Sequence, residues 1–149
     1  MRQLILLRHA HAESAAAGQD DLGRPLSGTG LAEARAAGDW LREHGLQPDR
    51  VLSSSAARTR ETLAALGDIG GAEVHEDASI YDASPGTLVA LADANRDAER
   101  LLLVGHNPGL EQLAALMHSG MTGDYRGMPP GGIAVLTLPA DVNIEPGIA

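Results

Sequence analysis

Four residues whose side chains suit phosphate chemistry stand just after short apolar runs of this chain: Arg8, His9, Arg58 and His106. A planar guanidinium can bind two oxygens of a phosphoryl group at once. A neutral imidazole nitrogen can attack phosphorus to form a covalent phosphohistidine, which water later cleaves. Nearby arginines favour that neutral form, because a like charge disfavours protonation of a histidine. The second histidine of such a pair, His106, can donate a hydrogen bond or positive charge to the reacting phosphoryl group.

The apolar runs indicate the strands that position these residues. Residues 4–7 and 101–104 are unbroken apolar stretches, too short for helices and without solvent-facing alternation, which indicates strands buried on both faces of a parallel sheet. A third run, from residue 51, leads into a helix whose first turn carries Arg58. Ligands of open α/β sheets bind at the carboxyl ends of the strands. We therefore expect the four side chains to converge at one edge of the sheet.

Helices are expected between the strands, at about residues 28–44, 56–66, 85–95 and from 108 onward. Ser27 is a candidate N-cap for the first helix, and Ser84 followed by Pro85 is the cap-plus-proline signal that opens the third. Asn107-Pro108 repeats that signal before the fourth helix. Strands that alternate with helices in this way predict an α/β fold, a three-layer αβα sandwich around a mostly parallel central sheet.

The rest of the chain gives weaker signals. A short strand is indicated near residues 73–75, and the β-branched stretch 133–138 indicates a last strand at or near an edge of the sheet. Residues 119–132 are rich in Gly and Pro and are expected to form a loop, while residues 141–149 are expected to be a frayed tail. A chain of 149 residues can bury one sizeable core and no linker divides it, so we expect a single domain over residues 1–149.

Composition argues against several classes of function. The chain has 11 Lys and Arg residues against 20 Asp and Glu, a formal charge of −9 and only 2% aromatic residues, which argues against nucleic-acid binding. It has no cysteine, so thiol nucleophiles, disulfides and thiolate metal sites are excluded. No apolar run approaches membrane-spanning length, and the amino terminus runs into the first strand without a signal peptide. We therefore expect a cytoplasmic protein that binds no membrane.

No metal or other cofactor is expected. The alternating spacing of His9, His11 and Glu13 is compatible with a metal site. The arginines that crowd this position would repel a divalent cation, and the sequence offers no third cluster of strong ligands.

Arg8-His9-Ala10 resembles the Arg-His-Gly signature of the histidine phosphatase superfamily, the phosphoglycerate-mutase-like proteins. Further stretches match the superfamily pattern in the expected order and together span nearly the whole chain: Arg24-Pro25-Leu26-Ser27, Ser54 to Arg58 with Glu61-Thr62, Tyr81 to Pro85, Val104 to Leu110, and Gly131 to Ala134. A lone Arg-His-Ala is weak support, whereas this ordered set is strong. Within the superfamily, the short chain is similar to the SixA type of phosphohistidine phosphatase.

The resemblance implies a role for each residue of the site. It makes His9 the nucleophile, Arg8 and Arg58 phosphate clamps, His106 the second catalytic histidine, and Arg24 a further phosphate ligand. Two positions depart from the superfamily pattern. Ala10 replaces the usual glycine and adds a methyl group at the strand end, and Ser55 replaces a proline, which affects rigidity more than chemistry.

Several assignments stay open at this point. Arg24 can bind phosphate, or it can tie down its loop by pairing with Asp20 or Asp21. Gly105 and Asn107 lie in the matched stretch around the second histidine and are candidates for substrate binding, although Asn107 also suits a helix cap.

The general acid is also open. Larger relatives carry a carboxylate that protonates an alcohol leaving group, and the SixA-like type looks short of one. Asp82 and Glu13 are the candidates in this chain. A phosphorylated imidazole has a labile P–N bond and can be protonated before cleavage, so it needs less help from a general acid.

The leading hypothesis is a metal-independent phosphatase that acts through phospho-His9 on phosphohistidine carried by a partner protein. A short chain has little room for a lid, so the pocket is expected to be open enough for a protein side chain. The first alternative is a phosphatase for a small phosphorylated metabolite. The second is a non-catalytic module that binds phosphate or a phosphoprotein.

Overall fold

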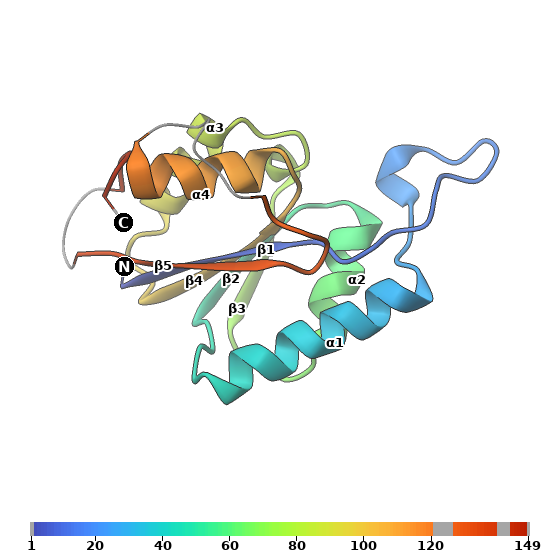
Figure 1. The fold of residues 1–149 in the computed structure, drawn as a ribbon, viewed down its shortest axis with the longest axis horizontal. Helices are drawn as coiled ribbons and strands as arrows, with labels where there is room; N and C mark the ends of the chain where they lie inside the picture. The colour runs from blue at the N-terminus through green and yellow to red at the C-terminus, as the bar shows by residue number, and fades with distance from the viewer. Residues whose placement is uncertain (1, 121–126, 140–143, 149) are drawn as a thin grey trace.

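The computed structural model describes residues 2–120, 127–139 and 144–148. Its strands are β1 (Gln3–Arg8), β2 (Arg50–Ser53), β3 (Glu73–Glu76), β4 (Arg100–Gly105) and β5 (Ile133–Thr137). They form one sheet in the order β3-β2-β4-β1-β5 (Figure 1). The first four strands are parallel, and β5 pairs antiparallel with β1 at the edge. This arrangement confirms the mostly parallel sheet, the weakly signalled third strand and the edge position of the last strand.

Helices cover both faces of the sheet, as expected for a three-layer αβα sandwich. In Figure 1, α1 (Gly28–Glu43) and α2 (Ala57–Ala65) lie below the sheet, and α3 (Pro85–Ala94) and α4 (Gly109–Ser119) lie above it. Two short 3-10 helices, η1 (Asp21–Gly23) and η2 (Ala78–Ile80), belong to the connections. The α/β fold class predicted from the sequence is confirmed.

The central strands are buried on both faces. In β1, Leu4 and Leu6 pack into the core under α3 and α4, while Ile5 and Leu7 pack into the core over α1 and α2. All four side chains are fully buried. Because each face of the strand meets a helical layer, both sets of alternate residues must be apolar, which is why the run is unbroken.

The helix starts follow the predicted caps with one exception. Ser27 and Ser84 each accept a backbone N–H in the first turn of their helix. At α4, however, Pro108 occupies the N-cap position, so the cap-plus-proline prediction is wrong by one residue. Asn107 Oδ1 accepts the N–H of Glu111 at 3.3 Å, while the Asn107 amide is also bonded to the loop before β5. This second bond holds Asn107 outside the helix.

The end of the chain is better packed than expected. Ile144 is only 5% exposed in the core under α3 and α4, and its N–H donates to Asp93 Oδ1 at 3.0 Å. The prediction of a frayed tail is therefore wrong for residues 144–148, because an apolar residue there completes the core. Other parts of the predicted tail and loop lie outside the described residues: 141–143, 149 and 121–126.

Among the described residues, no helix is both long enough and apolar enough to span a membrane.

Candidate active site

The register between β1 and β4 places the two histidines side by side. Arg8 lies opposite Gly105, and the N–H of His9 donates to the Gly105 carbonyl at 3.0 Å. The ring centroids of His9 and His106 are consequently 5.2 Å apart, with the ring planes inclined at 55°. Gly105 itself is buried and is not among the residues that line the pocket, so it contributes to the site through this backbone bond.

The hydrogen bond of His9 defines which of its nitrogens can react. Nδ1 lies 2.7 Å from the carbonyl oxygen of Ala10. A carbonyl only accepts hydrogen bonds, so Nδ1 carries the hydrogen and the lone pair lies on Nε2. Burial, together with the charges of Arg58, Arg8 and Arg24, lowers the pKa of His9 to about 4. The ring is therefore neutral at neutral pH, and its Nε2 has the electronic form of a nucleophile.

The end of β1 is tied to the helix that carries Arg58. The N–H of Ala10 donates to Thr62 Oγ1 at 3.0 Å, and the Thr62 hydroxyl donates to the Arg58 carbonyl at 2.7 Å. The methyl group of Ala10 is fully buried beside Leu26 and Ala34. The residue that replaces the usual glycine is thus accommodated without opening the strand end.

His106 is held by a buried serine. Its Nε2 lies 2.8 Å from Ser54 Oγ, which also accepts the N–H of Ala56 at 3.3 Å, and the serine hydroxyl can donate its hydrogen to this ring nitrogen. In that arrangement Nδ1 carries the hydrogen, and this buried atom has no hydrogen-bond partner among the described residues. Burial, with the charges of Arg58 and His9, lowers the pKa of His106 to about 3. A neutral ring with an unpaired N–H is suited to donate to an oxyanion.

The loop before β5 orients two more polar side chains. Arg8 Nη1 and Asn107 Nδ2 both donate to the carbonyl of Met128, at 3.0 and 2.8 Å. The Nε of Arg8 is buried and, within the part of the chain that the structure describes, makes no hydrogen bond. A buried guanidinium with an unsatisfied donor favours the binding of an anion.

Asp21 of η1 contacts the other two arginines. Arg58, which is 6% exposed, donates from Nη1 to the Asp21 carbonyl at 2.7 Å and from Nη2 to Asp21 Oδ2 at 2.9 Å. Arg24 Nη1 donates to Asp21 Oδ1 at 2.8 Å, and the Tyr81 hydroxyl donates to Oδ2. The bonds from Tyr81 and Arg24 hold the pKa of Asp21 far below its usual range. Of the two partners considered for Arg24, Asp20 and Asp21, the structure selects Asp21.

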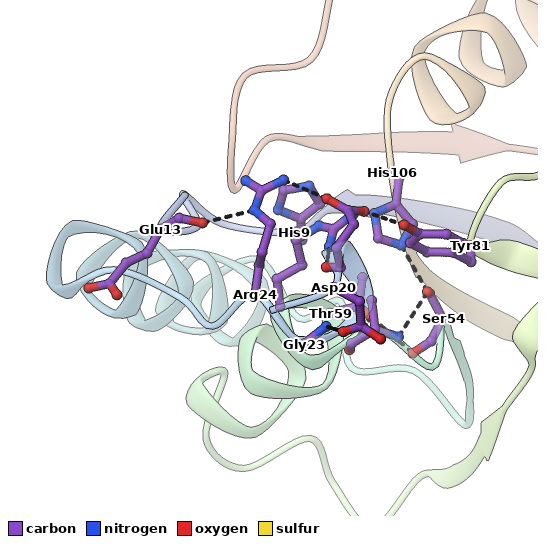
Figure 2. Close-up of polar contacts among 12 residues, drawn as sticks. His9, Glu13, Asp20, Gly23, Arg24, Ser54, Thr59, Tyr81 and His106 are labelled. Carbon is purple, nitrogen blue, oxygen red and sulfur yellow. Dashed lines mark hydrogen bonds and ion pairs between the residues drawn. The ribbon is translucent and has the colours of Figure 1, made fainter. Parts of the chain in front are cut away.

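The predicted convergence of side chains is confirmed. A single cavity of about 320 Å³ is lined by the four residues named first and by three further candidates: Arg8, His9, Arg58, His106, Arg24, Asn107 and Asp82. Glu13 is not brought to this cavity. Figure 2 shows its carboxylate pointing away from His9, and its backbone carbonyl accepts from Arg24 Nε at 2.8 Å.

The spacing of His9, His11 and Glu13 does not produce a metal site. The Nδ1 of His11 lies 2.7 Å from Ser27 Oγ. Among the described residues, no group of three or more histidine, aspartate or glutamate side chains could hold a metal ion.

Sequence reasoning missed three residues of the site: Ser54, Asp21 and Tyr81. The ring of Tyr81 stands edge-on to that of His106, with the ring centroids 5.3 Å apart (Figure 2). The Arg58 guanidinium lies 5.6 Å from the centroid of the Tyr81 ring. A tyrosine within a matched stretch, in a chain with only 2% aromatic residues, was the available signal. Ser54 also lies in a matched stretch, and Asp21 had been considered only as a partner of Arg24.

This αβα sandwich brings two histidines and three arginines to one cavity near the carboxyl ends of its parallel strands, a residue set that suits a phosphatase, a hydrolase of phosphoryl groups. The model of the histidine phosphatase superfamily (branch 1) matches residues 4–103. The chain belongs to this superfamily.

Three relatives place the chain near the SixA type. The first is a protein from Agrobacterium tumefaciens whose crystal structure is provisionally described as that of phosphohistidine phosphatase SixA. Its sequence is 35% identical, the alignment covers 92% of each chain, and the TM-score is 0.83. The protein histidine phosphatase SixA complexed with tungstate is 29% identical, with 91% of this chain and 88% of that chain covered and a TM-score of 0.76. Phosphohistidine phosphatase SixA of Escherichia coli K12 is 30% identical over 130 residues, 80% of this chain and 76% of its own length.

Proposed function

We propose that this protein is a metal-independent phosphatase that transfers the phosphoryl group of its substrate to His9 and then to water. The observation that carries the proposal is the state of His9, which is neutral and has its lone pair on Nε2 inside a cavity lined by arginines. Nε2 forms a bond to phosphorus while the bond from phosphorus to the leaving atom breaks, and the leaving group takes a proton. Water then attacks phosphorus, the N–P bond breaks, and inorganic phosphate leaves.

The arginines and His106 stabilise the charge that develops on the phosphoryl oxygens. Arg8 and Arg58 are the clamps, and Arg24 is a further ligand at the rim. His106 lines the same cavity and donates to the phosphoryl group as the transition state forms. Asn107 completes the donors on the α4 side of the cavity.

The proposed substrate is phosphohistidine on a partner protein. A phosphorylated imidazole can be protonated before cleavage, so the reaction proceeds without a strong general acid. The names of the SixA relatives support this substrate class, and the tungstate bound in one of them supports an oxyanion-binding pocket in the family.

A substrate panel in the presence of a chelator tests the proposal. Wild type is expected to hydrolyse phosphohistidine peptide, with a phosphorylated intermediate detected by mass spectrometry and mapped to His9. The His9→Ala variant is expected to lose both turnover and intermediate. Turnover that persists in His9→Ala would contradict the covalent mechanism. Tight binding of phosphate without turnover or intermediate would instead support a non-catalytic binding module.

One observation favours a second candidate, a phosphatase for small phosphorylated metabolites. Asp82 lines the cavity, and its carboxyl group could protonate an alcohol leaving group. An Asp82→Asn variant separates the candidates, because it should spare hydrolysis of phosphohistidine and impair hydrolysis of alkyl phosphates. Glu13→Gln is the matched control, since the Glu13 carboxylate points away from the cavity. If wild type hydrolysed alkyl phosphates faster than phosphohistidine, the phosphatase for small metabolites would be favoured.

A further inference from the structure

Asp21 places the chain's own carboxylate between two guanidiniums of the pocket. Its Oδ2 accepts from Arg58 at 2.9 Å, and its Oδ1 accepts from Arg24 at 2.8 Å. The Tyr81 hydroxyl donates to Oδ2, and the backbone carbonyl of Asp21 accepts from Arg58 at 2.7 Å. A carboxylate and a phosphoryl group both offer a guanidinium a pair of acceptor oxygens. The two groups therefore compete for the same donors.

The carboxylate is charged, yet the core does not hold it in place. The bonds from Tyr81 and Arg24 keep its pKa far below the usual range, so Asp21 is ionised at neutral pH. Its side chain is 48% exposed, and η1 contributes no buried residue. The segment around η1 extends past the carboxyl ends of the strands (Figure 1) and is anchored at its base by the bridge between Ala12 and Leu26. The carboxylate can leave the arginines without disturbing that anchor.

We propose that Asp21 is a specificity-determining residue, an internal competitor that the phosphoryl group of a substrate must displace from Arg58 and Arg24. The inference rests on the proposed function, because it assigns these arginines to the phosphoryl group. A phosphate monoester dianion brings two negative charges where the carboxylate brings one, so it displaces Asp21 more readily than a singly charged anion does. Asp21 thereby selects terminal phosphoryl groups against phosphodiesters and carboxylates.

A purely positioning role for Asp21 predicts the opposite behaviour. If the carboxylate merely held the two guanidiniums in the geometry that binds phosphate, its removal would weaken the binding of oxyanions. If it competes with them, its removal raises the fraction of protein that is ready to bind, and the apparent affinity rises with that fraction.

The first experiment measures the dissociation constant of tungstate by calorimetry for wild type, Asp21→Asn and Asp20→Asn. Asp21→Asn is expected to bind tungstate about tenfold more tightly than wild type. This factor corresponds to a rise in the fraction of protein with free arginines from about a tenth in wild type to nearly one in the variant. Asp20→Asn is the matched control. It removes the same charge from the same segment, and asparagine can still cap η1 as the Asp20 side chain does at Gly23 N–H. Its tungstate affinity is expected to stay within twofold of wild type.

The second experiment asks whether a free carboxylate can take the place of Asp21. In Asp21→Ala, acetate is expected to inhibit hydrolysis of p-nitrophenyl phosphate competitively, while wild type and Asp20→Asn are insensitive to acetate at the same ionic strength. Acetate inhibition of Asp21→Ala would show that a carboxylate occupies the position between Arg58 and Arg24. A general change in the charge of the protein would not make the enzyme sensitive to acetate.

Each outcome has a distinct meaning. The proposed role of Asp21 as a competitor is overturned if Asp21→Asn binds tungstate no more tightly than wild type, or if acetate does not inhibit Asp21→Ala. Either result leaves the proposed function standing. The proposed function itself would be overturned if neither wild type nor any variant bound tungstate or hydrolysed a phosphorylated substrate. Thermal unfolding of each variant verifies that the fold is retained.

Discussion

The imidazole rings of His9 and His106 lie 5.2 Å apart, although the two residues are far apart in the sequence, because they follow the carboxyl ends of the neighbouring parallel strands β1 and β4. Both rings are partly buried, and both lie within the field of Arg8 and Arg58. Each ring therefore resists protonation, and proximity to the other ring adds to this effect at His106. Two neutral imidazoles side by side allow one to attack phosphorus while the other donates a hydrogen bond.

The pKa of His9 predicts activity well into the acid range. His9 must be neutral to attack, and its pKa of about 4 means that it stays neutral until the pH falls close to that value. We therefore expect the contribution of His9 to the acid limb of kcat/KM near pH 4, well below the value near 6.5 of an unperturbed histidine. An NMR titration of the His9 ring protons, run beside the rate profile, separates this group from ionisation of the substrate. An inflection of the His9 signals between pH 6 and 7 would contradict the prediction.

The pKa of His106 predicts that it destabilises the folded protein in acid. Above pH 6.5 the ring is neutral in both states and contributes nothing. As the pH falls below 6.5, the unfolded chain binds a proton that the folded chain refuses until about pH 3, so stability is lost through that window. Between pH 7 and pH 5 this amounts to on the order of 2 kcal/mol. Urea unfolding at both pH values measures the loss of folding free energy between pH 7 and pH 5. We expect this loss to be smaller in His106→Gln than in wild type, by on the order of 2 kcal/mol. An equal loss in the two proteins would refute the shift.

Ser54 is predicted to fix the tautomer of His106. Removing its hydroxyl in Ser54→Ala takes away the donor to Nε2, so the fraction of His106 with hydrogen on Nδ1 should fall. The ¹⁵N chemical shifts of the ring report this change directly, and we expect kcat to fall about tenfold. Ser53→Ala is the matched control, because Ser53 is equally buried and its hydroxyl donates only to the Ser54 carbonyl, at 3.0 Å. Unchanged ring shifts in Ser54→Ala would show that the serine does not set the tautomer.

The parts of the site that lie on strands could be predicted because burial on both faces leaves a local pattern. The apolar runs before His9 and His106 identify two parallel strands, and each run ends two residues before its histidine. When the two strands pair side by side, the histidine rings therefore come together at the carboxyl ends. Contacts that join a loop to a distant turn leave no such pattern. The bond between Tyr81 and Asp21 spans 60 residues, and neither residue stands at a strand end. The burial of Ile144 was missed for a related reason, since the few apolar residues of the tail, among them Val142, Ile144 and Ile148, show no helical or strand period.

Arg58 offers the sharpest test of the phosphate clamp, because its neighbour Arg60 provides a control on the same helix. Arg58 is buried at the cavity and donates from both terminal nitrogens, whereas Arg60 is largely exposed and faces Glu76 across 4.0 Å. Lysine keeps the charge but loses the planar pair of donors that fits two phosphoryl oxygens. We expect Arg58→Lys to lower kcat/KM about 100-fold, as for loss of one preorganised donor to the transition state. Arg60→Lys should remain within twofold of wild type. Comparable activity of the two variants would mean that the charge at residue 58 suffices, and that two-point recognition by its guanidinium plays no part in catalysis.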